Sequence, residues 1–246
     1  MLNPFVFNKR VKAVIISYKA SEELKKLLKD LNIETIKTLP NTFLDVPVND
    51  HPDLVVHPID YKNILVCREY FNYYHKKLSK YDINVFSSKN YLEKNYPKDI
   101  YLNVSRVGRY FFHKKDCIDE NLNEQLIKHY KPVNVKQGYA KCSTMIIKNE
   151  TVVTTDLKLH EKYLNLGLKS YLLPPDFINL PGYDTGFIGG TCGNIGKDEI
   201  IFYGNLEKYR YSDKLLKILK KENIKYYYPK TDSFIDRGSV IGILGG

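Results

Sequence analysis

The sequence predicts an α/β protein in which five copies of one strand–strand–helix–strand unit close into a ring. Three observations predict this fold. A pattern of helix, chain-breaking residue and strand recurs five times along the 246 residues. Strand-like segments joined by tight turns lie between the copies. The chain also begins with one unmatched strand and stops one strand short of a fifth complete unit, so pairing its two ends would close the ring.

Two of the five helical segments carry the clearest signals. "SEELKKLLKDLNIETIKTL" begins at Ser21, a residue type that caps helices, and breaks at Asn32 before a β-rich stretch. "YSDKLLKILKKENIKYYYP" repeats this pattern with Ser212 as the cap and Asn223 as the breaker. Three weaker copies follow the same order. We expect the turns into the five following strands near Ile33, Ile83, Val133, Leu168 and Ile224.

The hairpins between these copies are also visible. "STMIIKNETVVTTD" is the clearest, with β-branched arms around residues 148–150. Further turns are expected at residues 107–108, 196–198 and 60–63. The last copy ends in "DRGSVIGILGG", and the amino-terminal "KAVIISYK" supplies the strand that it lacks. Because no Pro/Gly/Ser-rich linker interrupts the chain, residues 1–246 are expected to form a single domain.

Composition narrows the class of protein. The formal net charge of +10 comes mainly from lysines scattered among acidic residues, with no long basic tract. This pattern favours a solvated lysine surface, so a nucleic-acid or ribosomal partner is not favoured. No apolar run approaches the roughly 20 residues of a membrane helix, and the amino terminus lacks the pattern of a secretory signal. We therefore expect a cytoplasmic protein with no membrane partner.

The four cysteines are Cys67, Cys117, Cys142 and Cys192. They form no C-x-x-C pair and no close Cys/His cluster, so no structural zinc site is expected. No other metal or cofactor is predicted. In a cytoplasmic protein these residues are free thiols, and Cys67 and Cys117 are interpreted as buried small hydrophobic residues.

A glycine-rich stretch surrounds one of the other two cysteines. "GYDTGFIGGTCGNIG", residues 182–196, holds six glycines. It lacks the Lys-Ser or Lys-Thr of a Walker loop, and a hairpin follows it where a nucleophile elbow needs a helix. The favoured interpretation is close backbone packing with ligand access where strands converge. A glycine loop that carries a catalytic Cys192 and a phosphate cradle are the alternatives.

Aligning the units places Cys142 and Cys192 with respect to the axis. The segment 184–186 matches the segments 236–238 and 136–138, each of which ends in glycine. Cys142 stands four residues beyond its glycine and Cys192 six beyond. Because strand side chains alternate with a period of two, both cysteines are expected to share the facing of these glycines, near the axis.

The first unit is the most polar one. "VNDHPDLVVHP" places Asp50, His51, Asp53 and His57 at the start of its inner segment. A carboxylate can orient an imidazole, which can then act as a general base. Asp and Pro are also ordinary turn formers, and His57 is equally well explained as a satisfied buried histidine.

A closed ring of five such units resembles the pentein fold, a five-bladed α/β-propeller with pseudo-five-fold symmetry. Arginine deiminases, amidinotransferases and dimethylarginine hydrolases share this fold, as does a ribosome anti-association factor that is not an enzyme. "KDIYLNVSRVGRYFFHK" looks like one blade of the dimethylarginine hydrolases. "QGYAKCSTMIIKNE" and "YDTGFIGGTCG" together look like an uncharacterised bacterial family of this fold.

The resemblance implies a site for a small ligand at the mouth of a central channel. In these enzymes a cysteine thiolate attacks the guanidinium carbon, a histidine moves protons, and carboxylates hold the substrate's nitrogens. The residues that it assigns to these roles are the nucleophiles Cys142 or Cys192, the acid/base His51 or His57, and the substrate-binding Asp50, Asp53, Asp184, Asp236 and Asn103. If the protein is an enzyme, its reactive thiol is expected to have a depressed pKa.

Two departures from the family pattern keep a second interpretation open. Tyr139 or Ala140 stands where the family's histidine is expected, and the last unit, "IDRGSVIGIL", has no cysteine. The chain is therefore either a cysteine-dependent hydrolase or amidinotransferase that acts on a small guanidino or amidine compound, or a catalytically inactive ring. The inactive ring would bind a small ligand or a protein or ribosomal partner.

Overall fold

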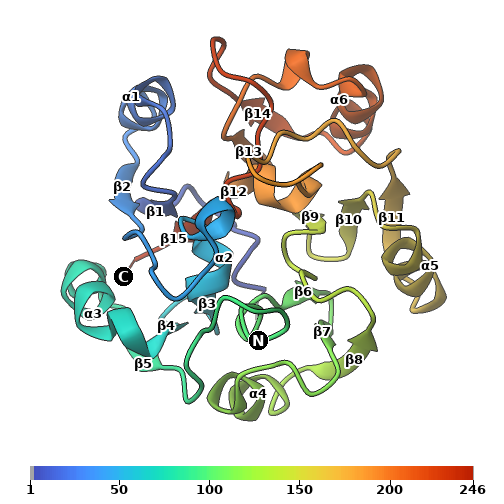
Figure 1. Ribbon diagram of the computed structural model, residues 1–246. Coiled ribbons are helices and arrows are strands. Elements are labelled where there is room, and N and C mark those ends of the chain that lie inside the picture. Colours follow the sequence, from blue (N-terminus) through green and yellow to red (C-terminus); the bar gives the residue numbers. More distant parts are fainter. Residues whose placement is uncertain (1–2, 246) are drawn as a thin grey trace.

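A computed structural model describes residues 3–245, which form five three-stranded sheets around a common axis (Figure 1). In every sheet the inner and middle strands pair antiparallel, and the middle and outer strands pair parallel. One helix joins each middle strand to its outer strand and lies on the outside of the ring (Figure 1). The predicted five-bladed α/β-propeller is confirmed.

The blades are numbered here in chain order of their hairpins. Blade I contains β3 (Val56–Pro58), β4 (Asn63–Val66), α3 (Phe71–Leu78) and β5 (Asn84–Ser87). Blade II contains β6 (Ser105–Val107), β7 (Tyr110–Lys114), α4 (Glu120–Leu126) and β8 (Lys131–Val135). Blade III contains β9 (Thr144–Lys148), β10 (Thr151–Thr154), α5 (Leu157–Asn165) and β11 (Lys169–Leu172). Blade IV contains β12 (Cys192–Gly196), β13 (Glu199–Phe202), α6 (Ser212–Lys221) and β14 (Lys225–Tyr227). Blade V contains β15 (Ile241–Ile243), β1 (Ala13–Ile16), α1 (Glu22–Asp30) and β2 (Glu34–Lys37).

Blade V closes the ring with strands from both ends of the chain. β15 pairs antiparallel with β1, so that Ile15 lies opposite Ile241 and Ala13 opposite Ile243. All four side chains are almost completely buried. The predicted pairing of "KAVIISYK" with "SVIGIL" is therefore confirmed.

The helix boundaries follow the sequence signals with one exception. The Ser21 hydroxyl accepts a hydrogen bond from the Leu24 amide and caps α1. Asn32 and Asn223 end their helices in the left-handed conformation, with φ of 58° and 55°. The prediction for Ser212 is wrong, because the Ser212 amide already donates to the Tyr209 carbonyl and Ser212 is the first residue of α6.

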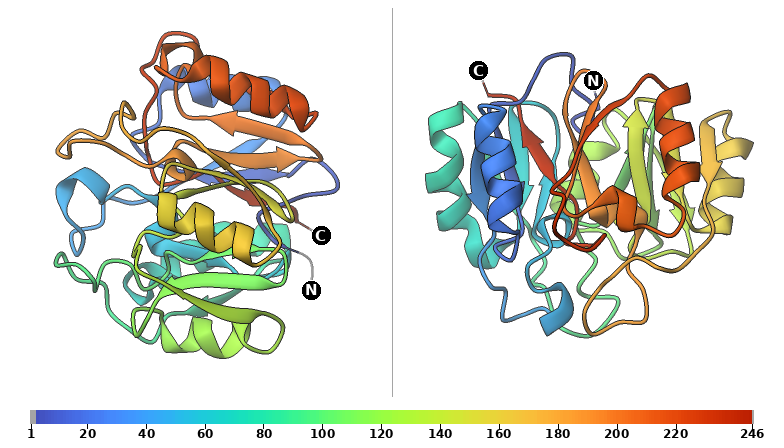
Figure 2. Two further views of the ribbon diagram at one scale, coloured as in Figure 1. Left: turned by 90° about the vertical axis from the view of Figure 1, so that its right-hand side faces the viewer. Right: turned by 90° about the horizontal axis from the view of Figure 1, so that it is seen from above.

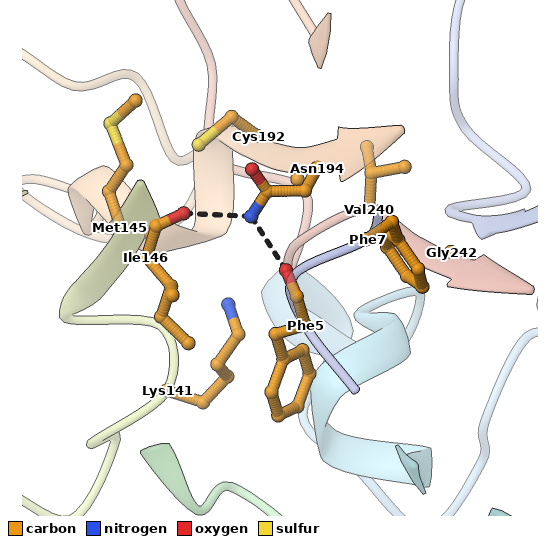
Figure 3. Close-up of a pocket in the computed structure, with 11 residues that line it drawn as sticks. Phe5, Phe7, Lys141, Met145, Ile146, Cys192, Asn194, Val240 and Gly242 are labelled. Atoms are coloured by element: carbon orange, nitrogen blue, oxygen red, sulfur yellow. Dashed lines mark hydrogen bonds between the residues drawn. The ribbon is translucent and has the colours of Figure 1, made fainter. Parts of the chain in front are cut away.

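The amino-terminal segment packs against the inner strands β9 and β12 (Figure 3). Phe5 and Phe7 lie there beside Lys141, Cys192 and Asn194. The Asn194 amide donates to the carbonyls of Phe5 (2.7 Å) and Ile146 (2.8 Å), which ties this segment to two blades. The space that remains is about 10 Å³, no more than one water occupies.

The glycine-rich stretch packs against the closing segment near the axis. A Cβ at Gly193 would lie 1.9 Å from the Val240 carbonyl oxygen, and one at Gly190 would lie 1.9 Å from Asp236 Oδ1. Close backbone packing therefore accounts for Gly193. Gly190 leaves room for the Asp236 carboxylate, which the Phe187 and Gly238 amides hold in place.

The two ends of the ring differ. The chain termini lie at one end, and the loops that precede β3, β6 and β12 extend at the other (Figure 2). Among residues 3–245, no helix is both long and apolar enough to cross a membrane.

Deleting residues 237–246 should abolish cooperative unfolding or lower the free energy of unfolding by roughly 5 kcal/mol or more. The deletion removes the buried side chains of Val240, Ile241 and Ile243, each worth about 1.5–3 kcal/mol, and exposes an edge of β1. Chemical denaturation measures this, with Ile127→Ala, a truncation of an exposed side chain on another blade, as the control. A truncated protein that is as stable as the control would show that ring closure contributes little.

Candidate active site

A cavity of about 130 Å³ opens at the end of the ring that carries the long loops. Its lining residues come from the loops before the inner strands: Val48, His51, Tyr139, Cys142, Leu180, Tyr183, Thr185, Phe187 and Asp236. Three residues of this lining, Cys142, His51 and Asp236, are predicted site residues.

Asn103 holds the Cys142 thiol in place. Its Oδ1 accepts the backbone amides of Lys141 (2.8 Å) and Cys142 (3.2 Å), and its Nδ2 lies 3.2 Å from Cys142 Sγ. Cys142 lies in a tight turn before β9 and not on a strand, since the Ser143 amide donates to the Tyr139 carbonyl. The strand-alternation argument is therefore wrong for Cys142, although the thiol does line the cavity.

Asp53 lies directly against the thiol. Residues 52–55 form the short helix α2 (Pro52–Val55), where an extended segment was expected, because Pro52 favours the first turn of a helix. The Cys142 thiol lies 3.1 Å from Asp53 Oδ1 and 3.0 Å from Oδ2. The Ser239 hydroxyl donates to the same carboxylate at 2.5 Å. Asp53 is 1 % exposed, so this cluster is screened from water.

His51 and Asp236 complete the cluster. A ring nitrogen of His51, a carboxylate oxygen of Asp53 and Cys142 Sγ lie within 4.8 Å of one another. Asp236 accepts the amides of Phe187 (2.8 Å) and Gly238 (2.9 Å), and burial raises its pKa while His51 opposes that rise. Among the described residues, the buried His51 Nε2 has no hydrogen-bond partner.

Gly238 allows the closing segment to pack against this histidine. Its φ is 74°, and an added Cβ would lie 2.2 Å from the Cβ of His51. Any side chain at position 238 would therefore displace His51 or the segment that carries Asp236 and Ser239.

The electrostatic environment keeps the Cys142 thiol protonated. Burial raises its pKa well above the ordinary value, and the negative charges of Asp53 and Asp236 raise it further. The depressed pKa expected of a reactive thiol is therefore absent in this state. Tyr139 does not replace the missing base, because burial and its hydrogen bond to Asp99 raise its pKa as well.

The same donor set has the chemistry of a metal site. Thiolate, imidazole and carboxylate are all ligands of Zn²⁺ in proteins. His51, Asp53 and Cys142 bring one of each close together, so tests of activity here need a chelator control.

The other candidate residues lie outside this cavity. His57 is buried at the Phe5 end, with its Nδ1 3.1 Å from the Leu102 carbonyl, and burial lowers its pKa. Cys192 also lies at that end, and burial raises its pKa to about 12. Asp50 binds Ser17 and Lys19, and Asp184 is exposed on its loop. The structure thus brings Cys142, His51, Asp53, Asp236 and Asn103 together and separates these four.

Sequence reasoning missed Ser239 and Lys141. The Lys141 ammonium donates to Ser239 Oγ at 2.9 Å and lies 5.4 Å above the Phe5 ring, on the channel side shown in Figure 3. Ser239 follows the segment 236–238 that the unit alignment already identified, so that alignment was a usable signal. For Lys141, adjacent to Cys142, only the fold shows that its side chain points away from the cavity lining.

Comparisons with known proteins agree with this architecture. A family model described as "Family of unknown function (DUF6873)" matches residues 15–241. No curated protein is similar enough in sequence to match the chain. Similar solved structures are an amidinotransferase from Microseira wollei in the saxitoxin biosynthetic pathway and an inosamine-phosphate amidinotransferase from Streptomyces griseus. The first is 10% identical and the second 12% identical to this chain, and both have a TM-score of 0.60. Each alignment covers 98% of this chain, together with 97% of the first structure and 96% of the second. The agmatine deiminase of C. jejuni is 12% identical, with a TM-score of 0.59 and coverage of 100% and 96%. These structures have the pentein fold.

Replacing Asp53 with Asn should lower the pKa of the Cys142 thiol and speed its alkylation at neutral pH. The substitution removes the negative charge that lies against Sγ, so the thiolate fraction rises at any given pH. The measurement is the pH dependence of iodoacetamide labelling, read at each cysteine by mass spectrometry. Asp50→Asn, a buried carboxylate outside the cavity, is the control. Identical Cys142 titrations in wild type and Asp53→Asn would contradict the electrostatic account.

Proposed function

Because the chain belongs to the family of unknown function DUF6873 and has the pentein fold, we propose that it is a cysteine-dependent enzyme acting on a small guanidino or amidine compound. One observation carries the proposal. A thiol, an imidazole and a buried carboxylate line one cavity, at Cys142, His51 and Asp236, and the second buried carboxylate, Asp53, contacts the thiol. The resemblance implies a ligand site at the mouth of a central channel, and this cavity is lined by the loops that precede the inner strands.

A planar cation suits these carboxylates. Asp236 holds its two oxygens on the Phe187 and Gly238 amides, which fixes the carboxylate at the cavity wall. A guanidinium or amidinium group presents parallel N–H donors that carboxylates bind strongly, especially in a dry site. We assign Asp236 to hold the substrate's nitrogens and Asp53 to add negative charge beside the thiol.

A bound cation would also lower the pKa of the Cys142 thiol. A positive charge about 4 Å from a thiolate stabilises it by about 4 kcal/mol at an effective dielectric of about 20, equivalent to about three pKa units. The substrate would therefore generate its own nucleophile, with His51 accepting the thiol proton.

The chemistry then follows in two steps. The Cys142 thiolate attacks the central carbon, a C–S bond forms, and the electrons of one C=N bond move to nitrogen. The leaving amine takes the proton from His51 as its C–N bond breaks, which leaves an amidino group on sulfur. Water, in a hydrolase, or an acceptor amine, in an amidinotransferase, next attacks that carbon and gives a proton to His51, and the C–S bond breaks to release the thiolate.

A ring that binds its ligand without chemistry is the second candidate. The raised pKa of Cys142 favours it, because a neutral thiol is a poor nucleophile. The two candidates differ in whether a bound cation activates Cys142.

A cationic alkylating agent distinguishes them. The rate of Cys142 labelling by 2-chloroacetamidine is divided by the rate with neutral 2-chloroacetamide, and this ratio is normalised to the same ratio for free cysteine. We expect a normalised ratio of at least about 10, which corresponds to about 1.4 kcal/mol. In this reaction the thiolate displaces chloride as the C–S bond forms. Asp236→Asn should bring the ratio close to 1, whereas Asp184→Asn, on the exposed loop, should not.

A chelator control and the labelling of Cys192 complete this test. Labelling is measured with and without a chelator, since His51, Asp53 and Cys142 can bind Zn²⁺. A normalised ratio near 1 in wild type, or preferential modification of Cys192, would leave the enzyme without a nucleophile that a cation activates.

A further inference from the structure

The walls of the cavity are mostly apolar, whereas its base is polar. Around the thiol lie His51 and Asp236, and the rest of the lining is Thr185 and five apolar or aromatic side chains, namely Val48, Tyr139, Leu180, Tyr183 and Phe187. Among the described residues that line the cavity, none is a lysine or an arginine. Asp236 is the one carboxylate among the described lining residues, so a cationic group inside the cavity would pair with it at the base.

Three basic residues near this cluster, Lys19, Arg237 and Lys141, have other partners. Lys19 Nζ lies 2.9 Å from Asp50, and Arg237 lies 3.6 Å from the same carboxylate. Lys141 donates to Ser239 and lies over the Phe5 ring, and it is not part of the cavity lining. A carboxylate on the ligand would lose water against these walls without gaining a cation, which is strongly unfavourable.

The apolar surface begins directly beside the carboxylate and continues to the rim. The Phe187 amide binds Asp236, and its ring stacks on Tyr139 with the centroids 5.8 Å apart. Tyr139 in turn packs on Tyr96, which is 48% exposed. At the other side of the mouth, Tyr183 is 46% exposed and its hydroxyl reaches Asp45.

We infer that the substrate is a guanidine or amidine whose substituent is apolar or aromatic and carries no carboxylate. The inference rests on the proposed function and names its substrate class. An arginine-like amino acid fits less well, because no lysine or arginine lines the cavity for its carboxylate, and an uncharged amide fits less well because it has no charge to pair with Asp236.

Calorimetric binding measurements on the full chain test this class. Benzamidine and butylguanidine should bind at least tenfold more tightly than arginine and 4-guanidinobutyrate, and benzamide should bind more weakly than benzamidine. Asp236→Asn should weaken benzamidine at least tenfold, because it removes the charge that receives the cation. Circular dichroism checks that the variant is folded.

A variant at the exposed rim provides a gain of function. Tyr183→Arg should raise the affinity for 4-guanidinobutyrate at least tenfold relative to butylguanidine, since one charge-assisted hydrogen bond is worth that much. Tyr183→Leu, which keeps the wall apolar, is the matched control and should leave that ratio unchanged.

Different binding results would overturn the substrate class alone or the proposed function as well. If arginine or 4-guanidinobutyrate binds wild type as tightly as butylguanidine, the substrate class is wrong while the proposed function stands. If no cationic guanidine or amidine binds, both are overturned.

Discussion

The carboxylate of Asp53 joins three parts of the molecule that are far apart in sequence. Its oxygens contact the Cys142 thiol at the start of blade III and the Ser239 hydroxyl in the segment that closes blade V. The backbone amide of Asp53 donates to the Gly238 carbonyl at 3.0 Å. Because Asp53 is buried, these contacts must satisfy most of its hydrogen-bonding capacity. Asp53 therefore contributes to the position of the thiol, the path of the closing segment and the charge of the site. Ring closure and site geometry are thus not independent, and damage to β15 should also disturb the cavity.

The same carboxylate helps to keep the Cys142 thiol protonated and places negative charge beside it. A thiol between Asp53 and Asn103 keeps its proton, because ionisation would place two negative charges together in a buried space. In the proposed function, a positively charged ligand reverses that balance and makes the thiolate favourable. We propose that the two buried carboxylates select the ligand and keep Cys142 protonated until it binds. The apolar walls strengthen both effects, since they exclude water and with it the competing solvation of the charges.

The sequence predicted the ring because its signals are local and repeated. Helix periodicity predicts each helix, and residues such as Asn32 and Asn223 predict where a helix ends. The unmatched strands at the two ends predict the closing pair. Because the pattern recurs five times, each copy supports the assignment of the others. The site was predictable only in part. The segment that holds Asp50, His51, Asp53 and His57 was recognisable as polar, but neighbours in sequence point to different ends of the channel. His57 lies at the Phe5 end, and Asp50 pairs with Lys19. That division depends on the one-turn helix α2, whose direction is set by tertiary packing and not by residue spacing. The turn that holds Cys142 was missed for the same reason, since a strand period was assumed where Asn103 organises a helical turn.

Activation of Cys142 by a bound cation is the central claim of this account, and the ultraviolet absorbance of the thiolate tests it most directly. The measurement is the change in thiolate absorbance at neutral pH when acetamidinium is added to wild type and to Cys142→Ser, with acetamide as the neutral control. We expect a saturable increase in wild type that is absent in Cys142→Ser and absent with acetamide. Acetamidinium that binds by calorimetry without any rise in thiolate absorbance would contradict the account and favour a ring that binds cations without chemistry.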